Sequence, residues 1–258
     1  MDTHSLWLLV TILFKCIGGI FLNISIHPLG DQALLIDFGE AINEETNQQV
    51  RQAAAHLEKQ KPDWMIEYIP AFSTLTILYN PYYIAKQMRS QKLLPYEWAR
   101  TKVLDLLSQT SSHHSEGRTI EIPVCYGGEW GPDLPFVASH NRMSEEEVID
   151  AHMKGDYLVY MIGFAPGFPY IGGMDKKIAA PRRDDPRLSI PSGSVGIAGE
   201  QTGVYPIETP GGWQLIGRTP LKLFEPDRES PSLLQAGDRI HFKRISEAEY
   251  SRLKEEDQ

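Results

Sequence analysis

Residues 161–224 read MIGFAPGFPYIGGMDKKIAAPRRDDPRLSIPSGSVGIAGEQTGVYPIETPGGWQLIGRTPLKLF, and this segment indicates what kind of domain the chain contains. It is rich in glycine and proline yet carries many large apolar side chains, whereas flexible linkers lack aromatic and β-branched residues because they have no core to fill. Glycine and proline here separate short apolar runs: Ser194–Ala198, Val204–Ile207, Trp213–Ile216 and Leu221–Phe224. This spacing predicts a compact all-β module with tight turns.

The same segment concentrates positive charge. Its arginines are Arg182, Arg183, Arg187 and Arg218. A rigid β-scaffold with clustered cations, and with glycines that let a ligand approach the backbone, predicts a pocket for a small anion. Arg187 lies close to Asp184 and Asp185, so we expect a surface ion pair there rather than a ligand contact.

The composition is that of an ordinary globular protein and limits the classes of function. Of 258 residues, 41% are hydrophobic and 23% are charged, and the net charge is −9. An acidic chain of this kind is a poor partner for a nucleic-acid backbone. Cys16 and Cys125 form neither a metal-binding spacing nor a disulfide framework, and no histidine pattern indicates a metal site. We therefore expect a reducing compartment, the cytoplasm, and no metal.

The first 23 residues form a hydrophobic N-terminal extension. The run Leu6–Phe14 (LWLLVTILF) is shorter than the roughly 20 apolar residues that a membrane-spanning helix needs. It also lacks the basic residues that precede the apolar core of a signal peptide. Two interpretations stay open: an upstream extension outside the folded domains, or a membrane anchor.

Residues 24–110 are expected to form a first, α+β domain. Asn43 is a candidate N-cap for a helix over residues 44–59, and Pro95 is placed to open a second helix. The expected strands are Ala33–Phe38, Trp64–Pro70 and Thr74–Tyr79, with Thr119–Val124 as a candidate closing strand. The order β-α-β-β-α suggests a ferredoxin-like unit. The polar run at 108–117 marks the boundary that follows it.

Residues 118–246 are expected to form the second domain. The strands expected in addition to the apolar runs above are Thr119–Tyr126, Tyr157–Phe164 and Asp238–Arg244. A short helix is expected over 133–140, and Ser144 and Glu147 form a capping-box pattern at the start of another. Residues 247–258 are expected to form a charged C-terminal helix.

Several long motifs, occurring in the same order, resemble the family of the 5-oxoprolinase B subunit. They are IPVCYGGEWGPDL (122–134), YMIGFAPGFPYIGGM (160–174), residues 189–224 and LLQAGDRIHF (233–242). This carboxyltransferase-domain family includes the kinase A inhibitor of sporulating bacilli and the subunit-1 domain of allophanate hydrolase-like proteins. The chain resembles the bacillus-type inhibitor branch most. The resemblance extends from about Ile24 to Glu249, which is nearly all of the chain beyond the N-terminal extension.

The resemblance implies a fold and an activity. The second domain is expected to be a cyclophilin-like β-barrel, with no prolyl isomerase activity carried over. The chain is expected to be the B subunit of a 5-oxoprolinase (EC 3.5.2.9), which converts 5-oxoproline, ATP and water to glutamate, ADP and phosphate. The A and C subunits are the implied partners, ATP is the implied cofactor of the complex, and the isolated chain is expected to be inactive. Neither a Walker A sequence nor a Rossmann fingerprint occurs, so the sequence does not locate the ATP site.

5-Oxoproline carries a carboxylate and a lactam amide, and the sequence offers candidate groups for both. An arginine suits the carboxylate, whereas backbone N–H and side-chain amide groups suit the lactam. The candidate substrate-binding residues are Arg182, Ser192, Gly193, Gln201, Thr202, Tyr205, Trp213 and Arg218. The candidates for a cleft rim or partner surface are Phe164, Pro166, Gly167, Phe168 and Tyr170. Structural roles are open alternatives for most of them, and no residue is assigned as catalytic.

A function from a different class stays open. The chain is also expected, as an alternative, to inhibit a sporulation sensor histidine kinase by docking on it and blocking autophosphorylation. In that case the aromatic side chains of Phe164–Tyr170 would anchor the kinase. A third role, in urea or allophanate metabolism, is weaker because the chain contains neither a biotin carboxylase nor an amidase.

Overall fold

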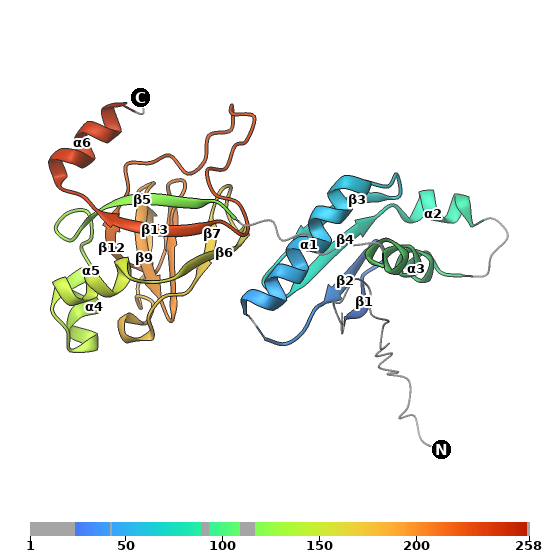
Figure 1. The fold of residues 1–258 in the computed structure, drawn as a ribbon, viewed down its shortest axis with the longest axis horizontal. Helices are drawn as coiled ribbons and strands as arrows, with labels where there is room; N and C mark the ends of the chain where they lie inside the picture. Colours follow the sequence, from blue (N-terminus) through green and yellow to red (C-terminus); the bar gives the residue numbers. More distant parts are fainter. Residues whose placement is uncertain (1–23, 42, 89–92, 109–116, 257–258) are drawn as a thin grey trace, which may run out of the picture. The chain divides into compact units, whose positions relative to one another are not determined.

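The structure, a computed structural model, describes residues 24–41, 43–88, 93–108 and 117–256 (Figure 1). The expected N-terminal extension therefore lies outside the described residues. The chain divides into two compact units, residues 1–115 and 116–258. Among the described helices, none is long and apolar enough to cross a membrane.

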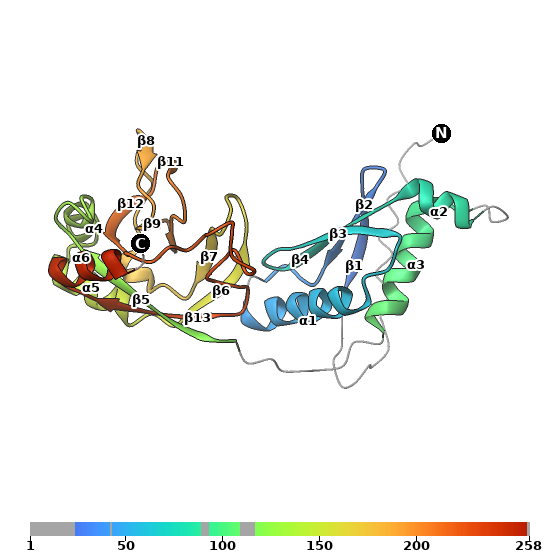
Figure 2. The ribbon, with the colours of Figure 1, turned by 90° about the horizontal axis from the view of Figure 1, so that it is seen from above.

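The first unit is a four-stranded antiparallel sheet covered by helices. The strands are β1 (Ser25–Leu29), β2 (Ala33–Asp37), β3 (Met65–Pro70) and β4 (Thr74–Tyr79), in the spatial order β1-β2-β4-β3. The helices are α1 (Glu44–Gln60), α2 (Pro81–Gln87) and α3 (Pro95–Leu107). Leu34 and Ile36 on β2 pair with Ile77 and Leu75 on β4, and all four side chains are fully buried. They form the sheet face against which α1 and α3 pack (Figures 1 and 2).

Two predictions for this unit have different outcomes. Asn43 caps α1, since its side chain accepts a hydrogen bond from the Thr46 N–H, as its sequence position predicts. The prediction that Thr119–Val124 closes the sheet is wrong. That segment pairs in parallel with residues 239–244 in the second unit, and β1 supplies the fourth strand instead. The ferredoxin-like arrangement stays a prediction.

The second unit contains a closed seven-stranded barrel, which confirms the expected β module. The spatial order is β10-β7-β6-β13-β5-β12-β9. The strands are β5 (Thr119–Tyr126), β6 (Tyr157–Ile162), β7 (Pro169–Gly172), β9 (Ser194–Ala198), β10 (Gln201–Val204), β12 (Gln214–Arg218) and β13 (Arg239–Arg244). Strands β13 and β5 pair in parallel, and the other neighbours are antiparallel. Two of the expected apolar runs differ from the structure: only Val204 of Val204–Ile207 lies in a strand, and Leu221–Phe224 forms none, with only an isolated bridge from Phe224 to Ser232.

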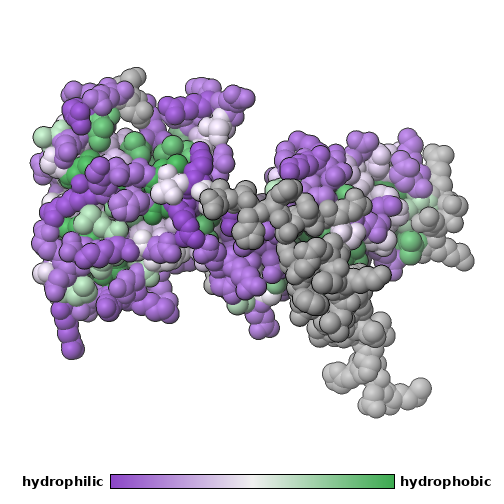
Figure 3. All heavy atoms as spheres, in the orientation of Figure 1, coloured by the Kyte–Doolittle hydropathy of each residue, from purple (hydrophilic) through white to green (hydrophobic). Residues whose placement is uncertain are grey.

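Two further strands form a ribbon outside the barrel, and three helices pack against the barrel. The ribbon consists of β8 (Arg187–Ile190) and β11 (Thr209–Gly211), and it projects from the barrel in Figure 2. The helices are α4 (Leu134–Asn141), α5 (Glu145–Met153) and α6 (Glu247–Glu256), with a single 3₁₀ turn η1 (Lys176–Ile178). The capping box of Ser144 and Glu147 at the start of α5 is confirmed. The face shown in Figure 3 is mostly hydrophilic, and apolar residues show between hydrophilic ones.

A buried histidine and its hydrogen-bond partners lie among the apolar side chains of the barrel core. His152 is fully buried, with Nδ1 2.8 Å from the Tyr126 hydroxyl and Nε2 2.9 Å from Thr202 Oγ1. Thr202 Oγ1 donates to the Gly196 carbonyl at 3.1 Å, so it accepts the proton of Nε2, and the Tyr126 hydroxyl donates to Nδ1. Burial lowers the pKa of His152 from 6.5 to about 3. The imidazole is thus a neutral, fully hydrogen-bonded part of the core.

Candidate functional site

A small pocket of about 150 Å³ opens at one side of the barrel. It is bounded by the β6–β7 loop, strands β7, β10 and β11, and the segments before β8 and β12. The residues that line it are Phe164, Phe168, Tyr170, Arg182, Gln201, Tyr205, Pro210, Gly211, Gly212 and Trp213. The pocket therefore brings together Arg182, Gln201, Tyr205 and Trp213 with the expected rim aromatics, although these residues span fifty positions of the sequence.

Phe168 is the centre of an aromatic cluster that forms the pocket wall. Its ring meets those of Phe164, Tyr170, Tyr205 and Trp213 edge to face, at centroid distances of 5.7, 5.4, 5.7 and 5.9 Å. Edge-to-face contacts of this kind favour one arrangement of the rings. Phe168, Tyr205 and Trp213 are buried, so the wall is fixed before any ligand arrives.

The β6–β7 loop forms the rim. Phe164 lines the pocket but is 76% exposed, and its φ of +69° is unusual for a bulky residue. The Ala165 N–H donates to the Gly163 carbonyl at 2.9 Å across this residue, which is the pattern of a γ-turn. Gly167, with φ +75°, packs so closely on Phe224 that a Cβ would lie 2.8 Å from that side chain. Pro166 is exposed, and neither Pro166 nor Gly167 lines the pocket.

Arg182 is the cation of the pocket. It is exposed, and within the described part of the chain its guanidinium makes no hydrogen bond or ion pair. Its neighbours are anchored on both sides: the Pro181 carbonyl accepts a hydrogen bond from Gln214 Nε2 at 2.9 Å, and the Arg183 N–H donates to the Gly212 carbonyl at 2.8 Å. A fixed backbone thus presents a positive charge that has no partner among the residues the structure describes.

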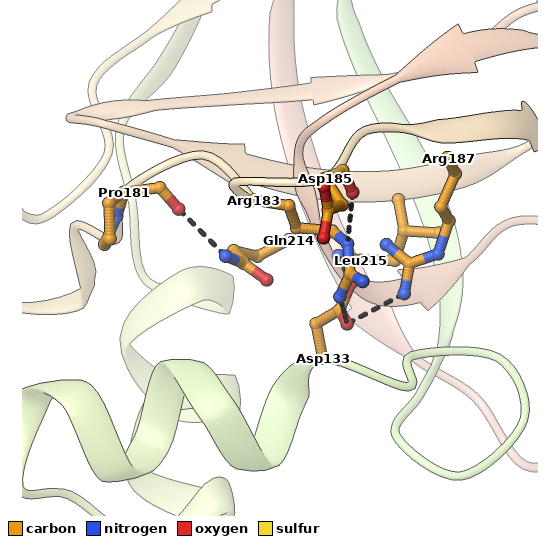
Figure 4. A network of polar contacts seen from close by, with 7 residues as sticks. All are labelled: Asp133, Pro181, Arg183, Asp185, Arg187, Gln214 and Leu215. Atoms are coloured by element: carbon orange, nitrogen blue, oxygen red, sulfur yellow. Dashed lines mark hydrogen bonds and ion pairs between the residues drawn. The ribbon is translucent and has the colours of Figure 1, made fainter.

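Asp133, which is not among the predicted site residues, lies beside Arg183 and Arg187 (Figure 4). Its Oδ1 accepts hydrogen bonds from Arg183 Nη1 at 3.1 Å and from Arg187 Nη2 at 2.8 Å. The expectation that Arg187 forms a surface ion pair with its neighbouring aspartates is wrong, because its partner is this buried carboxylate from fifty-four residues away. The sequence signals at Asp133 are its position at the start of the helix expected over 133–140 and its place in the motif at 122–134, and neither indicates its arginine partners.

The other predicted site residues lie elsewhere. Arg218 Nε donates to the Ser192 carbonyl at 2.8 Å, and its guanidinium carbon lies 6.0 Å from the centre of the Trp130 ring. Gly193, with φ +83°, turns tightly against the Thr219 carbonyl, which a Cβ would approach to 2.3 Å. Thr202 is buried beside His152. Ser192, Gly193, Thr202 and Arg218 are not among the residues that line the pocket.

Electrostatics in the pocket favour an anion. Burial raises the pKa of the Tyr205 phenol above its ordinary value, while the Trp213 backbone amide and the positive charges of Arg182 and Arg187 oppose that rise. The phenol is therefore a neutral hydrogen-bonding group near neutral pH. Among the described residues, no group of three or more histidine, cysteine, aspartate or glutamate side chains is placed to hold a metal ion. The pocket thus combines a positive charge with flat aromatic side chains.

A wider depression of about 450 Å³ lies beside α5, and we do not place the site there. Its four acidic lining residues have internal roles: Glu147 caps α5, Asp175 caps η1, Asp156 pairs with Arg239 at 2.8 Å, and Asp150 pairs with Lys154 at 3.7 Å. It contains no aromatic wall. The smaller pocket combines an unpaired cation with fixed aromatic side chains, which is the usual composition of a ligand site.

Comparison with known proteins gives a consistent result. The family model described as carboxyltransferase domain, subdomain C and D, matches residues 24–234. The chain is 56% identical to the 5-oxoprolinase B subunit of Bacillus subtilis over 232 residues, covering 90% of this chain and 97% of that protein. It is 46% identical to the 5-oxoprolinase B subunit of Escherichia coli O157:H7, covering 69% and 77%.

A solved structure supports the fold. The crystal structure of TTHA0988 superposes with a TM-score of 0.72 at 35% identity over 83% of this chain. The present chain spans only 40% of that longer chain.

Proposed function

The chain belongs to the carboxyltransferase-domain family that contains the 5-oxoprolinase B subunit, and on this premise we propose that it is the B subunit of an ATP-dependent 5-oxoprolinase. The complex would convert 5-oxoproline, ATP and water to glutamate, ADP and phosphate. The lactam is an unstrained amide, so it needs activation: transfer of the γ-phosphoryl group of ATP to the lactam oxygen releases ADP, water adds to the carbonyl carbon, the C–N bond breaks, and a second water displaces phosphate to give glutamate.

The observation that carries the proposal for the site is Arg182, a cation without an internal partner at an aromatic pocket. In this proposal the guanidinium of Arg182 pairs with the carboxylate of 5-oxoproline. Gln201, whose side-chain amide both donates and accepts, binds the lactam amide. The flat ring packs against Phe168 and Trp213, which fixes its orientation.

The size of the pocket favours 5-oxoproline over ATP as its ligand. At about 150 Å³ it is smaller than the 300–1,000 Å³ of pockets that bury drug-sized ligands. It therefore suits a small metabolite and not a nucleotide. We propose that ATP binds elsewhere in the complex and that this chain contributes the pocket for 5-oxoproline.

The A and C subunits, as partners, form part of the same proposal. The relatives are named as one subunit of a 5-oxoprolinase, which implies others. The match to only 40% of TTHA0988 supports a fused arrangement of this region with a further segment in that protein. The closed barrel with flanking helices supports a cyclophilin-like second domain, and a cytoplasmic location follows from a metabolic role that consumes ATP.

The test is 5-oxoproline-dependent ATP hydrolysis by the chain purified with the A and C subunits, with each of the three left out in turn. Glutamate and ADP should form in equal amounts, and only when all three subunits are present. Turnover that continues at the same rate without this chain would reject the enzyme role.

A second candidate function, docking on a sensor histidine kinase, is favoured by one observation. Phe164 exposes 76% of its surface at a loop tip, and an exposed aromatic side chain is a common anchor in protein interfaces. Phe168 does not contribute to such a surface, because it is buried in the aromatic cluster. A kinase autophosphorylation assay with wild-type chain and Phe164→Ala distinguishes the two functions: inhibition that depends on Phe164 supports the kinase role, and no inhibition rejects it.

A further inference from the structure

Asp133 connects three parts of the second unit at one point. Its side chain is 7% exposed and comes directly before α4. Besides the two arginines, Oδ2 accepts a hydrogen bond from the Leu215 N–H at 2.7 Å, and the Asp133 N–H donates to the Leu215 carbonyl at 2.9 Å. One residue thus holds the start of α4, strand β12 and the arginine-bearing segment together (Figure 4).

The groups that Asp133 holds are next to the pocket in sequence and in space. Arg183 follows Arg182 directly, and Leu215 lies two residues after Trp213. Arg187 pairs across the ribbon with Gly211, which also lines the pocket. Loss of the Asp133 carboxylate would therefore remove one hydrogen bond to Arg183, next to Arg182, and one to Leu215 on β12.

We propose that Asp133 is a positioning residue of this pocket: it fixes the segment that carries Arg182 against strand β12, which begins directly after Trp213. The guanidinium of Arg182 is then held at the pocket before the ligand arrives, and little conformational entropy is lost on binding. The inference rests on the proposed function, because it takes a carboxylate of a small lactam as the partner of Arg182.

Charge and positioning predict opposite effects for one substitution. Two guanidinium groups share the single carboxylate of Asp133. Replacing this carboxylate with an amide makes the neighbourhood of the pocket more positive by one charge. If Asp133 acted only through its charge, Asp133→Asn would strengthen the binding of an anion. If it acts by positioning, the same change weakens binding despite the extra positive charge.

Asp238 provides a matched control. Its side chain is 4% exposed, accepts hydrogen bonds from Arg118 Nε and Nη2 and from the Gln235 N–H, and lies outside the pocket. Asp133→Asn and Asp238→Asn each remove one buried carboxylate from a comparable network. We expect both to lower Tm, while only the first alters the pocket.

The experiment compares these variants in the full chain assembled with the A and C subunits. Asp133→Asn is expected to raise KM for 5-oxoproline by about tenfold or more with kcat changed by less than about twofold, because ground-state binding is what positioning supports. Asp133→Glu keeps the charge but displaces the carboxylate, so it should raise KM as well. If Asp133→Asn does not fold, Asp133→Glu tests whether Asp133 acts by positioning. An unchanged or lowered KM in a folded Asp133 variant, or an equal rise in Asp238→Asn, would overturn the proposal.

Hydrogen exchange of the full chain makes the two possible failures distinguishable. If the wild-type complex shows no 5-oxoproline turnover, the proposed function fails, but the exchange of the Arg183 and Leu215 amides can still be measured. Positioning predicts at least about tenfold faster exchange of both amides in Asp133→Asn, and unchanged exchange in Asp238→Asn. Unchanged protection in Asp133→Asn would overturn the positioning role whatever the ligand.

Discussion

Phe168 packs edge to face against Trp213, with ring centroids 5.9 Å apart and an interplanar angle of 89°. Phe164 lies four residues before Phe168 in the same loop, yet 76% of its surface is exposed whereas Phe168 is 3% exposed. Two phenylalanines in one loop therefore have different roles, one as part of the pocket wall and one at its rim.

This difference gives the first prediction. Phe168→Ala should lower the free energy of unfolding by about 3–5 kcal/mol, because it leaves a cavity in the aromatic cluster. Phe164→Ala should change stability by less than about 0.5 kcal/mol, since the side chain is mostly in solvent. Urea unfolding of both variants measures the contrast. Equal losses would mean that Phe164 packs as a core residue.

Arg182 should determine selectivity for a carboxylate. In the assembled complex, Arg182→Ala is expected to raise KM for 5-oxoproline by about tenfold to a hundredfold, and Arg182→Lys should raise it less because it keeps the charge without the bidentate geometry. Inhibition by 2-pyrrolidone, the same lactam without the carboxylate, should be unaffected by Arg182→Ala. Arg252→Ala, on the exposed face of α6, is the control for loss of a positive charge. If Arg182→Ala weakens the binding of 2-pyrrolidone as much as that of 5-oxoproline, Arg182 does not bind the carboxylate.

His152 should make stability depend on pH. Its pKa is about 3 in the folded protein and 6.5 ordinarily, so between these values the unfolded chain binds more protons than the folded one. The stabilisation is complete above pH 6.5 and falls by up to about 1.4 kcal/mol per pH unit as the pH is lowered towards 3. Urea unfolding at pH 7, 6, 5 and 4 measures the slope. His152→Gln should reduce it. Equal slopes in the wild type and His152→Gln would contradict the assignment.

The rim loop should tolerate no side chain at Gly167. This residue has φ +75° and contacts Phe224, whereas Gly199 has φ +59° with open space around its Cβ position. Gly199→Ala should cost about 1–2 kcal/mol from backbone strain alone. Gly167→Ala should cost more, because its methyl group also displaces Phe224. Thermal unfolding compares the two variants, and equal costs would show that the loop moves away from Phe224 without penalty.

The sequence predicts the bounds of two barrel strands, both apolar and followed by glycine, but Leu221–Phe224 is also apolar, follows Pro220 and forms no strand. Strand β9 coincides with the expected run Ser194–Ala198, and β5 with Thr119–Tyr126. The ribbon strands β8 and β11 were not expected, because each is only three or four residues long and is defined by pairing with a segment about twenty residues away. Local periodicity contains no information about such a pairing.

For the candidate site, the chemical type of a side chain predicted which residues line the pocket better than closeness in the sequence did. Arg182, Gln201, Tyr205 and Trp213 line the pocket, and all four carry groups suited to a small lactam acid. Thr202, next to Gln201, points instead to the barrel interior, since neighbouring residues of a strand face opposite sides. The sequence did not reveal the role of Asp133, because its side-chain partners lie 50, 54 and 82 positions away in the sequence.

The most direct test of the central claim is glutamate formation when this chain is added back to the A and C subunits. The wild-type chain should restore 5-oxoproline-dependent glutamate and ADP formation, and Arg182→Ala should restore it only at 5-oxoproline concentrations about tenfold or more higher. If glutamate forms at the same rate without the chain, or if Arg182→Ala restores turnover with an unchanged KM, the pocket at Arg182 is not the 5-oxoproline site.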